Sequence, residues 1–174
     1  ASQLARWTGS RVVCVKYRLA PEDPFPAALD DSFAVYEWLS ERYQVALIGE
    51  SGGAYLCFAI ALRCRDDKVI VPRAIVVNSI PADLSGKTIT HQDVPSEITV
   101  KVAGIDALNR MYAPNEDPSN PLVNVIHGDY SGFPPVRVVY DDGELLVPDS
   151  LAVIARLRAA GIPVGPDRVI DSLR

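Results

Sequence analysis

The sequence has no excess of positive charge and no long apolar run. Its 17 Lys and Arg residues are outnumbered by 22 Asp and Glu residues, giving a net charge of −5; this balance disfavours nucleic acid and anionic membranes as partners. No apolar run approaches the roughly 20 residues of a membrane-spanning helix, and the first residues lack the apolar core of a signal peptide. The sequence therefore predicts neither a nucleic-acid partner nor a membrane span.

Cysteine and histidine are also scarce, with three and two copies. Cys14, Cys57 and Cys64 lack the spacing of metal ligands, so the sequence predicts no metal and no other cofactor. Cys57 and Cys64 are seven positions apart within one helical pattern, and we expect them to be small core residues on one helix face. Unpaired thiols indicate a reducing, cytoplasmic environment.

The chain does have the composition of one ordinary globular domain, with 174 residues of which 48% are apolar. Apolar runs, typical of buried parallel strands, occur at 11–17, 46–48, 73–78 and 134–140, with a weaker one at 162–170. Helical patterns occur at 2–8, 27–43, 54–65, 104–112 and 147–160. This alternation predicts a single α/β domain over 1–174, with a mainly parallel sheet and helices on both faces.

The rest of the chain is organised around residues 46–54 (ALIGESGGA). Three apolar residues lead into the pattern G-x-S-x-G, with Ser51 at its centre and a helical pattern behind it. A strand, a sharp turn and a helix in this order hold such a serine in a strained conformation, and small residues two positions before and after it let the strand and helix pass closely. The backbone N–H of Gly52 would then face an oxyanion formed at Ser51. The pattern predicts a nucleophilic hydrolase.

Longer blocks of sequence resemble the hormone-sensitive-lipase-like branch of the α/β-hydrolases. In the order found in that family, they are 17–22 (YRLAPE), 24–28 (PFPAA), 49–53 (GESGG), 132–135 (GFPP), 144–146 (ELL) and 149–150 (DS). The resemblance extends from about residue 4 to residue 160. It implies the α/β-hydrolase fold and an esterase or lipase activity on a small-molecule ester, with water as the acyl acceptor.

The resemblance also assigns roles to individual residues. It implies that Ser51 is the nucleophile, that the Gly52 N–H is an oxyanion donor, and that Glu144 is the acid of the catalytic triad. Glu144 stands two positions before Leu146, as the family's acid stands before a leucine. Asp142 is the alternative acid, and a solvated turn carboxylate without a catalytic role is the structural alternative for Glu144.

The residues after the serine depart from the family's usual pattern. Ala54 and Tyr55 stand where a small residue and an asparagine are usual. The Tyr55 ring either narrows the acyl pocket or packs beneath the turn. Packing is the preferred interpretation.

Two components of the family's site have no counterpart. The His-Gly-Gly block that supplies further oxyanion donors would precede the first strand, and the catalytic histidine would follow the helix after the acid. His91 and His127 both precede Glu144, so we expect them to be surface or loop residues. We therefore predict a partial hydrolase domain, inactive or weak by itself. The alternative is a non-catalytic pseudo-hydrolase that binds a small molecule, as in the plant gibberellin receptors that resemble this family.

Overall fold

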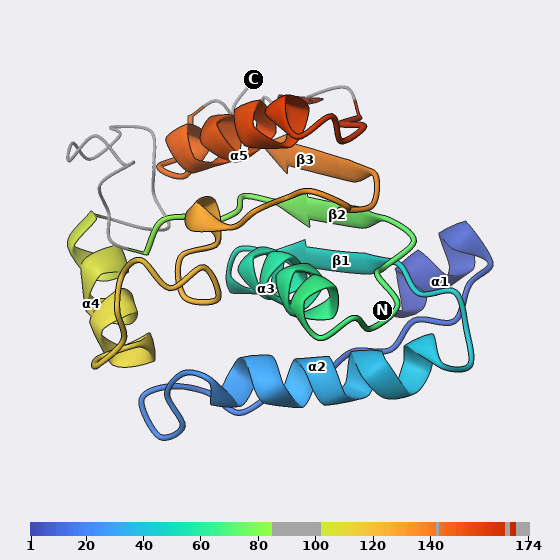
Figure 1. Cartoon of the computed structure of the whole chain (residues 1–174), viewed down its shortest axis with the longest axis horizontal. Helices are drawn as coiled ribbons and strands as arrows, with labels where there is room; N and C mark the ends of the chain where they lie inside the picture. Colours follow the sequence, from blue (N-terminus) through green and yellow to red (C-terminus); the bar gives the residue numbers. More distant parts are fainter. Residues whose placement is uncertain (85–101, 142, 166–167, 170–174) are drawn as a thin grey trace.

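Four parallel strands form the sheet and follow one another in sequence order. The computed structural model describes residues 1–84, 102–141, 143–165 and 168–169. Within these ranges the strands are β1 (Leu47–Glu50), β2 (Ile75–Asn78), β3 (Val136–Tyr140) and β4 (Arg168–Val169), paired in the order β1-β2-β3-β4 (Figure 1). The predicted parallel sheet is confirmed.

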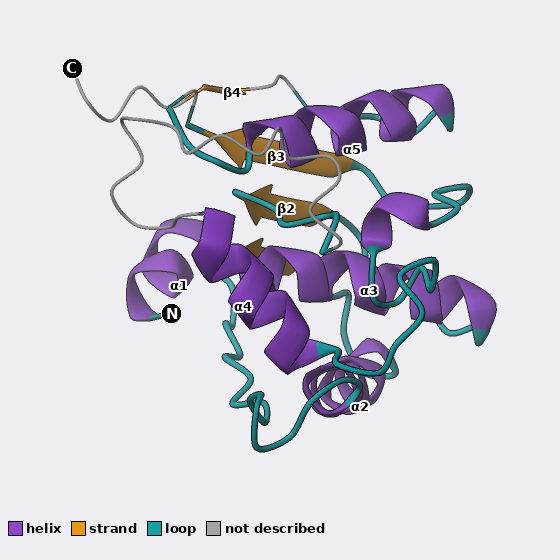
Figure 2. Ribbon diagram, turned by 90° about the vertical axis from the view of Figure 1, so that its left-hand side faces the viewer, coloured by secondary structure: helices purple, strands orange, loops and turns teal. Residues whose placement is uncertain are grey.

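Helices lie on both sides of this sheet. They are α1 (Ser2–Thr8), α2 (Ala27–Ser40), α3 (Gly52–Asp66), α4 (Val102–Tyr112) and α5 (Val147–Ala159), with a short 3-10 helix η1 (Val125–His127). Helix α3 packs against β1 and β2, α5 packs against β3, and α2 packs against α3. Figure 2 shows α1 on the opposite side of the sheet from α3 and α5, and none of its residues is buried.

The strand register explains where the core lies. Ile75 lies between Leu47 and Val136 in the ladder, and side chains two positions apart along a strand point to the same face. That face is buried against α3 and α5. Ile48 points to the other face and is 57% exposed. The main core therefore lies between the sheet and these two helices.

Helix α3 is the central helix of that core. Ten of its 15 residues are buried, which is typical of a helix covered on nearly all sides. Cys57 and Cys64 are among them, as predicted, and burial raises the pKa of each thiol to about 12. Both cysteines are therefore protonated packing residues.

An ion pair holds the proline-rich segment 18–26 against α2. The Arg18 backbone N–H and Nε both donate to Oδ2 of Asp31, at 2.9 and 3.0 Å, and Nη2 donates to Oδ1 at 2.8 Å. Hydrogen bonds from Arg18 lower the pKa of Asp31 to about 2, because they favour the charged carboxylate. Arg18 therefore fixes the segment before α2 by hydrogen bonds to both carboxylate oxygens of Asp31.

The prediction of a strand over 11–17 is wrong. The structure has no strand there and none of these residues is buried. A strand needs a ladder partner, and among the described strands β1 is bonded only to β2. Other boundaries differ as well: the helix expected over 27–43 ends at Ser40. Within the strand expected over 162–170, the described residues form β4 and an isolated parallel bridge between Val164 and Val136.

Candidate active site

Ser51 lies at the junction of β1 and α3 in a strained backbone conformation. Its φ is 51° and its ψ is −120°, a combination that residues with side chains rarely adopt. The Ser51 N–H donates to the carbonyl of Asn78 at 3.0 Å, and the Ser51 carbonyl accepts the N–H groups of Ala54 and Tyr55 at 2.8 and 3.1 Å. The residue is exposed. The expected sharp turn is present, and the catalytic role of Ser51 stays a prediction.

Gly49 permits the close approach of strand and helix. A Cβ atom at this position would lie 2.2 Å from the carbonyl oxygen of Gly53 and 2.6 Å from the backbone nitrogen of Ala54. Gly53 is different, because a Cβ atom there would meet nothing within 4 Å. The expectation that small residues are needed on both sides of the serine is therefore right for Gly49 and wrong for Gly53.

The first turn of α3 presents backbone N–H groups beside Ser51. The first four N–H groups of a helix have no acceptor within the helix, and Gly52 is the first residue of α3. The aligned peptide dipoles also give this end a partial positive charge. Gly52 is exposed, and a Cβ atom there would meet nothing within 4 Å. These features suit the predicted oxyanion donor.

Glu144 lies in the turn between β3 and α5. Its N–H donates to the carbonyl of Asp141 at 3.2 Å, and the N–H of Gly143 donates to Oδ1 of Asp141 at 2.9 Å. Oε2 of Glu144 accepts the hydroxyl of Ser79 at 2.6 Å. Glu144 is thus a half-buried carboxylate with a defined partner, unlike a solvated turn residue. Asp142, the alternative acid, lies outside the described residues.

Ser79 connects the region of the serine to that of the acid. Its N–H donates to the carbonyl of Val139 at 3.0 Å and its hydroxyl donates to Glu144, while the preceding carbonyl, of Asn78, accepts the N–H of Ser51. No motif in the sequence marks Ser79. The only signal is its position directly after an apolar strand, at the edge where the carboxyl ends of parallel strands meet.

Asp149 ties the chain after β2 to the first turn of α5. Its Oδ2 accepts the N–H groups of Ala82 and Asp83 at 2.7 and 3.0 Å, and Oδ1 is buried without a hydrogen-bond partner among the described residues. Burial raises the pKa of Asp149 to about 6; the two backbone hydrogen bonds oppose that shift and the Asp83 charge adds to it. The sequence marks Asp149 only as part of a family block, without a role.

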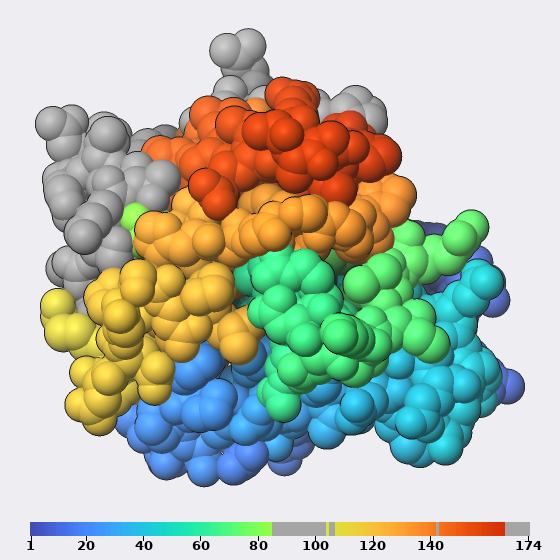
Figure 3. All heavy atoms as spheres, viewed as in Figure 1, coloured from blue at the N-terminus to red at the C-terminus, as the bar shows by residue number. Residues whose placement is uncertain are grey.

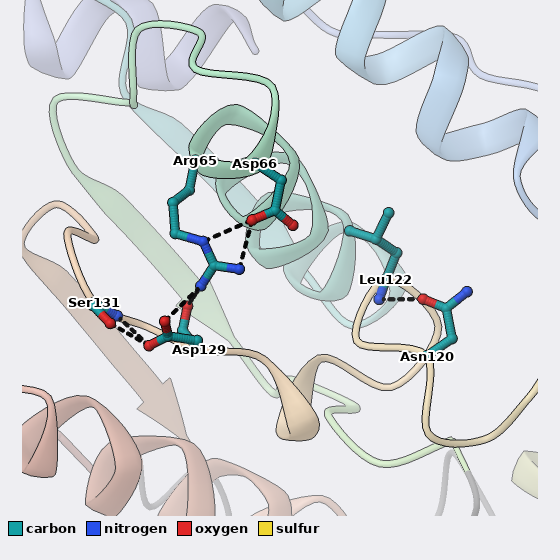
Figure 4. A network of polar contacts seen from close by, with 6 residues as sticks. All are labelled: Arg65, Asp66, Asn120, Leu122, Asp129 and Ser131. Carbon is teal, nitrogen blue, oxygen red and sulfur yellow. Dashed lines mark hydrogen bonds and ion pairs between the residues drawn. The ribbon is translucent and has the colours of Figure 1, made fainter.

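The segment 125–131 is anchored to the C-terminal half of α3. In Figure 3 its orange atoms lie against the green atoms of that helix. The guanidinium of Arg65 donates to the carbonyl of Asp129 and lies 3.4 Å from its carboxylate (Figure 4). From the other side, Arg156 of α5 donates to the carbonyl of Gly128 at 2.8 Å. Two arginines therefore fix η1 and the residues after it.

This anchoring keeps His127 away from Ser51. A Cβ atom on Gly128 would lie 2.7 Å from Cδ2 of Leu62, so the chain beside His127 contacts α3 at a residue 11 positions beyond Ser51. At the rise of an α-helix, this is about 16 Å along the axis. His127 is exposed and is outside hydrogen-bond reach of Ser51. His91 lies outside the described residues.

Tyr55 packs beneath the turn, as preferred from the sequence. It is 3% exposed, its hydroxyl donates to the carbonyl of Leu122, and it accepts the hydroxyl of Tyr112 at 3.3 Å. The two rings meet edge to face, with centroids 5.6 Å apart. The carbonyl of Tyr112 in turn accepts the N–H of Phe25 at 2.7 Å. Tyr55 therefore joins α4 and the proline-rich segment to the first turn of α3.

Other kinds of site were sought in the described part of the chain. No group of three or more His, Cys, Asp or Glu residues within it is arranged to hold a metal ion. No helix within it combines the length and the apolar character that crossing a bilayer requires. A hollow of about 480 Å³ beside α4 includes Arg110 and Glu116 in its lining, but neither Ser51 nor Glu144.

A parallel sheet with an exposed serine in a strained strand-to-helix turn defines an α/β-hydrolase. The chain belongs to the α/β hydrolase fold family, whose sequence profile matches residues 1–169. It is 34% identical over 169 residues to an acetyl-hydrolase of Streptomyces hygroscopicus, covering 94% of this chain and 56% of that protein. It is 31% identical over 176 residues to the carboxylesterase/phospholipase LipF of Mycobacterium tuberculosis, covering 91% and 45%.

Solved structures agree with this assignment. An esterase from the bacterial hormone-sensitive lipase family superposes with a TM-score of 0.87 at 31% identity, over 95% of this chain and 57% of that one. A mutant of the esterase E40 superposes with a TM-score of 0.89 at 31% identity, with the same coverage. These relatives and solved structures are thus named as esterases, an acetyl-hydrolase and a carboxylesterase/phospholipase. It spans about half the length of the curated relatives it matches.

Proposed function

We propose that this chain carries the nucleophile and the acid of a carboxylic ester hydrolase, with Ser51 and Glu144 in those roles. The observation that carries the proposal is the conformation of Ser51, because a side chain held at a φ of 51° costs stability and is typical of functional sites. Glu144 supports the proposal, because its carboxylate accepts a hydrogen bond from the hydroxyl of Ser79. Ser79 directly follows Asn78, whose carbonyl accepts the N–H of Ser51.

The proposed reaction is acyl transfer to water in two steps. Oγ of Ser51 forms a bond to the ester carbonyl carbon while its proton passes to an imidazole base. The N–H of Gly52 stabilises the tetrahedral oxyanion. Collapse of this intermediate breaks the ester C–O bond, and the alcohol leaves with the proton. Water then attacks the acyl-serine in the same way, which releases the carboxylic acid and restores Ser51.

Glu144 is proposed to orient the imidazole and to balance its positive charge during both steps. Loss of one member of such a triad removes most of its rate advantage. His127 is not the base, because its segment is fixed beside Leu62 and Arg65. We therefore propose that the 174 residues alone turn over esters slowly or not at all.

The substrate class proposed is a small-molecule carboxylic ester. Relatives named acetyl-hydrolase, esterase and carboxylesterase/phospholipase support this class. In this chain it is supported by the exposed residues Ser51 and Gly52 at the first turn of α3, where the backbone N–H groups have no acceptor within the helix. No metal or cofactor has a role in the proposed reaction.

The test is covalent labelling of the 174-residue chain by a fluorophosphonate probe, with and without added imidazole. Imidazole replaces the missing base, so we expect slow labelling without it and faster labelling with it. Ser51→Ala should abolish both, and Ser10→Ala, at an exposed serine, is the matched control. Labelling that persists in Ser51→Ala refutes the nucleophile. Ser51-dependent turnover of p-nitrophenyl acetate without imidazole refutes the claim of low activity, and His91→Ala would then test the other histidine.

A non-catalytic role in binding a small molecule is the second candidate. The observation that favours it is the separation of His127 from Ser51. This candidate predicts that Ser51 stays unlabelled even at high imidazole concentration. The two candidates are therefore separated by the same experiment.

A further inference from the structure

Three residues other than glycine have a positive φ in the described part of the chain: Ser51, Lys68 and Ser79, at 51°, 58° and 53°. Ser51 forms the turn discussed above. Lys68 ends α3: its N–H donates to the carbonyl of Arg65, and the next N–H, of Val69, donates to that of Cys64, which is the ordinary termination of a helix by a left-handed residue. Ser79 ends a strand, so helix termination does not account for its conformation.

Hydrogen bonds on both sides hold Ser79 in this conformation. Its own N–H donates to Val139 on β3, and the carbonyl of Asn78 accepts the N–H of Ser51 from the end of β1. The backbone at 78–79 is therefore bonded to both neighbouring strands. Glycine adopts a positive φ without strain. A serine differs from a glycine here only in its Cβ, which is unfavourable, and its hydroxyl.

That hydroxyl donates to Oε2 of Glu144 at 2.6 Å, the length of a strong hydrogen bond to a charged acceptor. A glutamate side chain has three rotatable bonds, and one fixed oxygen removes much of that freedom. From this geometry we infer that Ser79 is a positioning residue, which holds the carboxylate of Glu144 in its working orientation and couples it through Asn78 to the backbone of Ser51. The inference rests on the proposed function of Glu144.

The inference predicts a loss of reactivity that a change in stability does not explain. Ser79→Gly relieves the backbone strain, which raises the urea midpoint, and removes the hydrogen bond to the Glu144 carboxylate, which lowers it. We expect imidazole-dependent labelling of Ser51 to fall about tenfold, corresponding to about 1.4 kcal/mol. Lys68→Gly is the matched control: it relieves the same kind of strain at an exposed site, so the midpoint should rise while labelling is unchanged. If Ser79 had a purely structural role, the folded Ser79→Gly chain would be labelled at the wild-type rate.

A double variant tests whether Ser79 acts through Glu144. In the Glu144→Gln background, Ser79→Gly should cause no further loss of imidazole-dependent labelling, because the positioned carboxylate is already absent. The inference would be overturned if Ser79→Gly lowered the labelling rate in the Glu144→Gln background as much as it does in wild type. It would also be overturned if Ser79→Gly alone were labelled at the wild-type rate.

A second readout does not depend on reactivity. The urea midpoints of wild type, Ser79→Ala, Glu144→Gln and the double variant should be non-additive if the two side chains interact. If wild type is not labelled even with imidazole, the proposed function fails, and the non-additive midpoints still show that Ser79 holds Glu144. Additive midpoints overturn the inference about Ser79 whether or not Ser51 is labelled.

Discussion

The buried carboxylate of Asp149 should make the stability of the fold depend on pH in an unusual direction. Most carboxylates have a lower pKa in the folded state than in the unfolded state, because folding stabilises their charged form. Protonating them in acid therefore destabilises the fold. Asp149 is the opposite case, because burial raises its pKa from an ordinary value of 3.8 to about 6. Asp83 adds a second buried carboxylate beside it, and the ring of Tyr130 lies within electrostatic range.

The native chain thus binds this proton more tightly than the unfolded chain does. The contribution of Asp149 to stability is present below about pH 4 and is lost as the pH rises to about 6. A pKa shift of about two units corresponds to about 3 kcal/mol. From this group alone, the free energy of unfolding should therefore be about 3 kcal/mol lower at neutral pH than at pH 4. Asp31 titrates lower, near 2, so its contribution is lost only below this window.

The perturbation is Asp149→Asn. The amide oxygen still accepts the N–H groups of Ala82 and Asp83, but the side chain no longer titrates. Urea unfolding followed by far-ultraviolet circular dichroism at several pH values gives both stability profiles. The difference in the free energy of unfolding between wild type and Asp149→Asn should change by about 3 kcal/mol between pH 4 and neutral pH. Asp31→Asn is the control, and its stability profile should run parallel to that of wild type above about pH 5. Parallel profiles for wild type and Asp149→Asn would refute the reasoning.

Two further predictions concern packing around the serine. Gly49→Ala should lower the free energy of unfolding by at least about 2 kcal/mol, because its Cβ would overlap the backbone of Gly53; Gly53→Ala is the control, and its open Cβ position in α3 should give equal or higher stability by thermal unfolding. Tyr55→Phe should cost about 1 kcal/mol through the lost bond to the carbonyl of Leu122. Tyr112→Phe should then lower the free energy of unfolding little further in the Tyr55→Phe background, because the Tyr112 hydroxyl donates to that of Tyr55. Fully additive losses of stability would contradict this shared hydrogen-bond network.

Much of the fold is predictable from local pattern and from family resemblance. The nucleophile turn, α3, α5 and the strands β1 to β3 all carry their own periodicity, and each was expected within a few residues. The segment 11–17 has the same β-branched composition but forms no strand. The reason is that a ladder depends on a neighbour, which composition does not report.

The contacts around the candidate acid are less predictable, because they join distant parts of the chain. Ser79 and Glu144 are 65 positions apart, and a serine after a strand looks like any loop residue. Asp149 likewise contacts residues 66 and 67 positions away. Only the packing of β2, β3 and α5 brings these groups together.

The positive φ values of Ser51 and Ser79 have a consequence for how such a site is lost. Each serine occupies a backbone conformation that glycine adopts without strain, so a change to glycine at Ser51 should stabilise the fold by about 1 kcal/mol. At Ser79 the loss of the hydrogen bond to Glu144 opposes that gain. One base substitution converts two of the six serine codons to glycine codons. A lineage that no longer needed the chemistry would therefore gain stability by replacing Ser51, and selection for stability would favour glycine at that position.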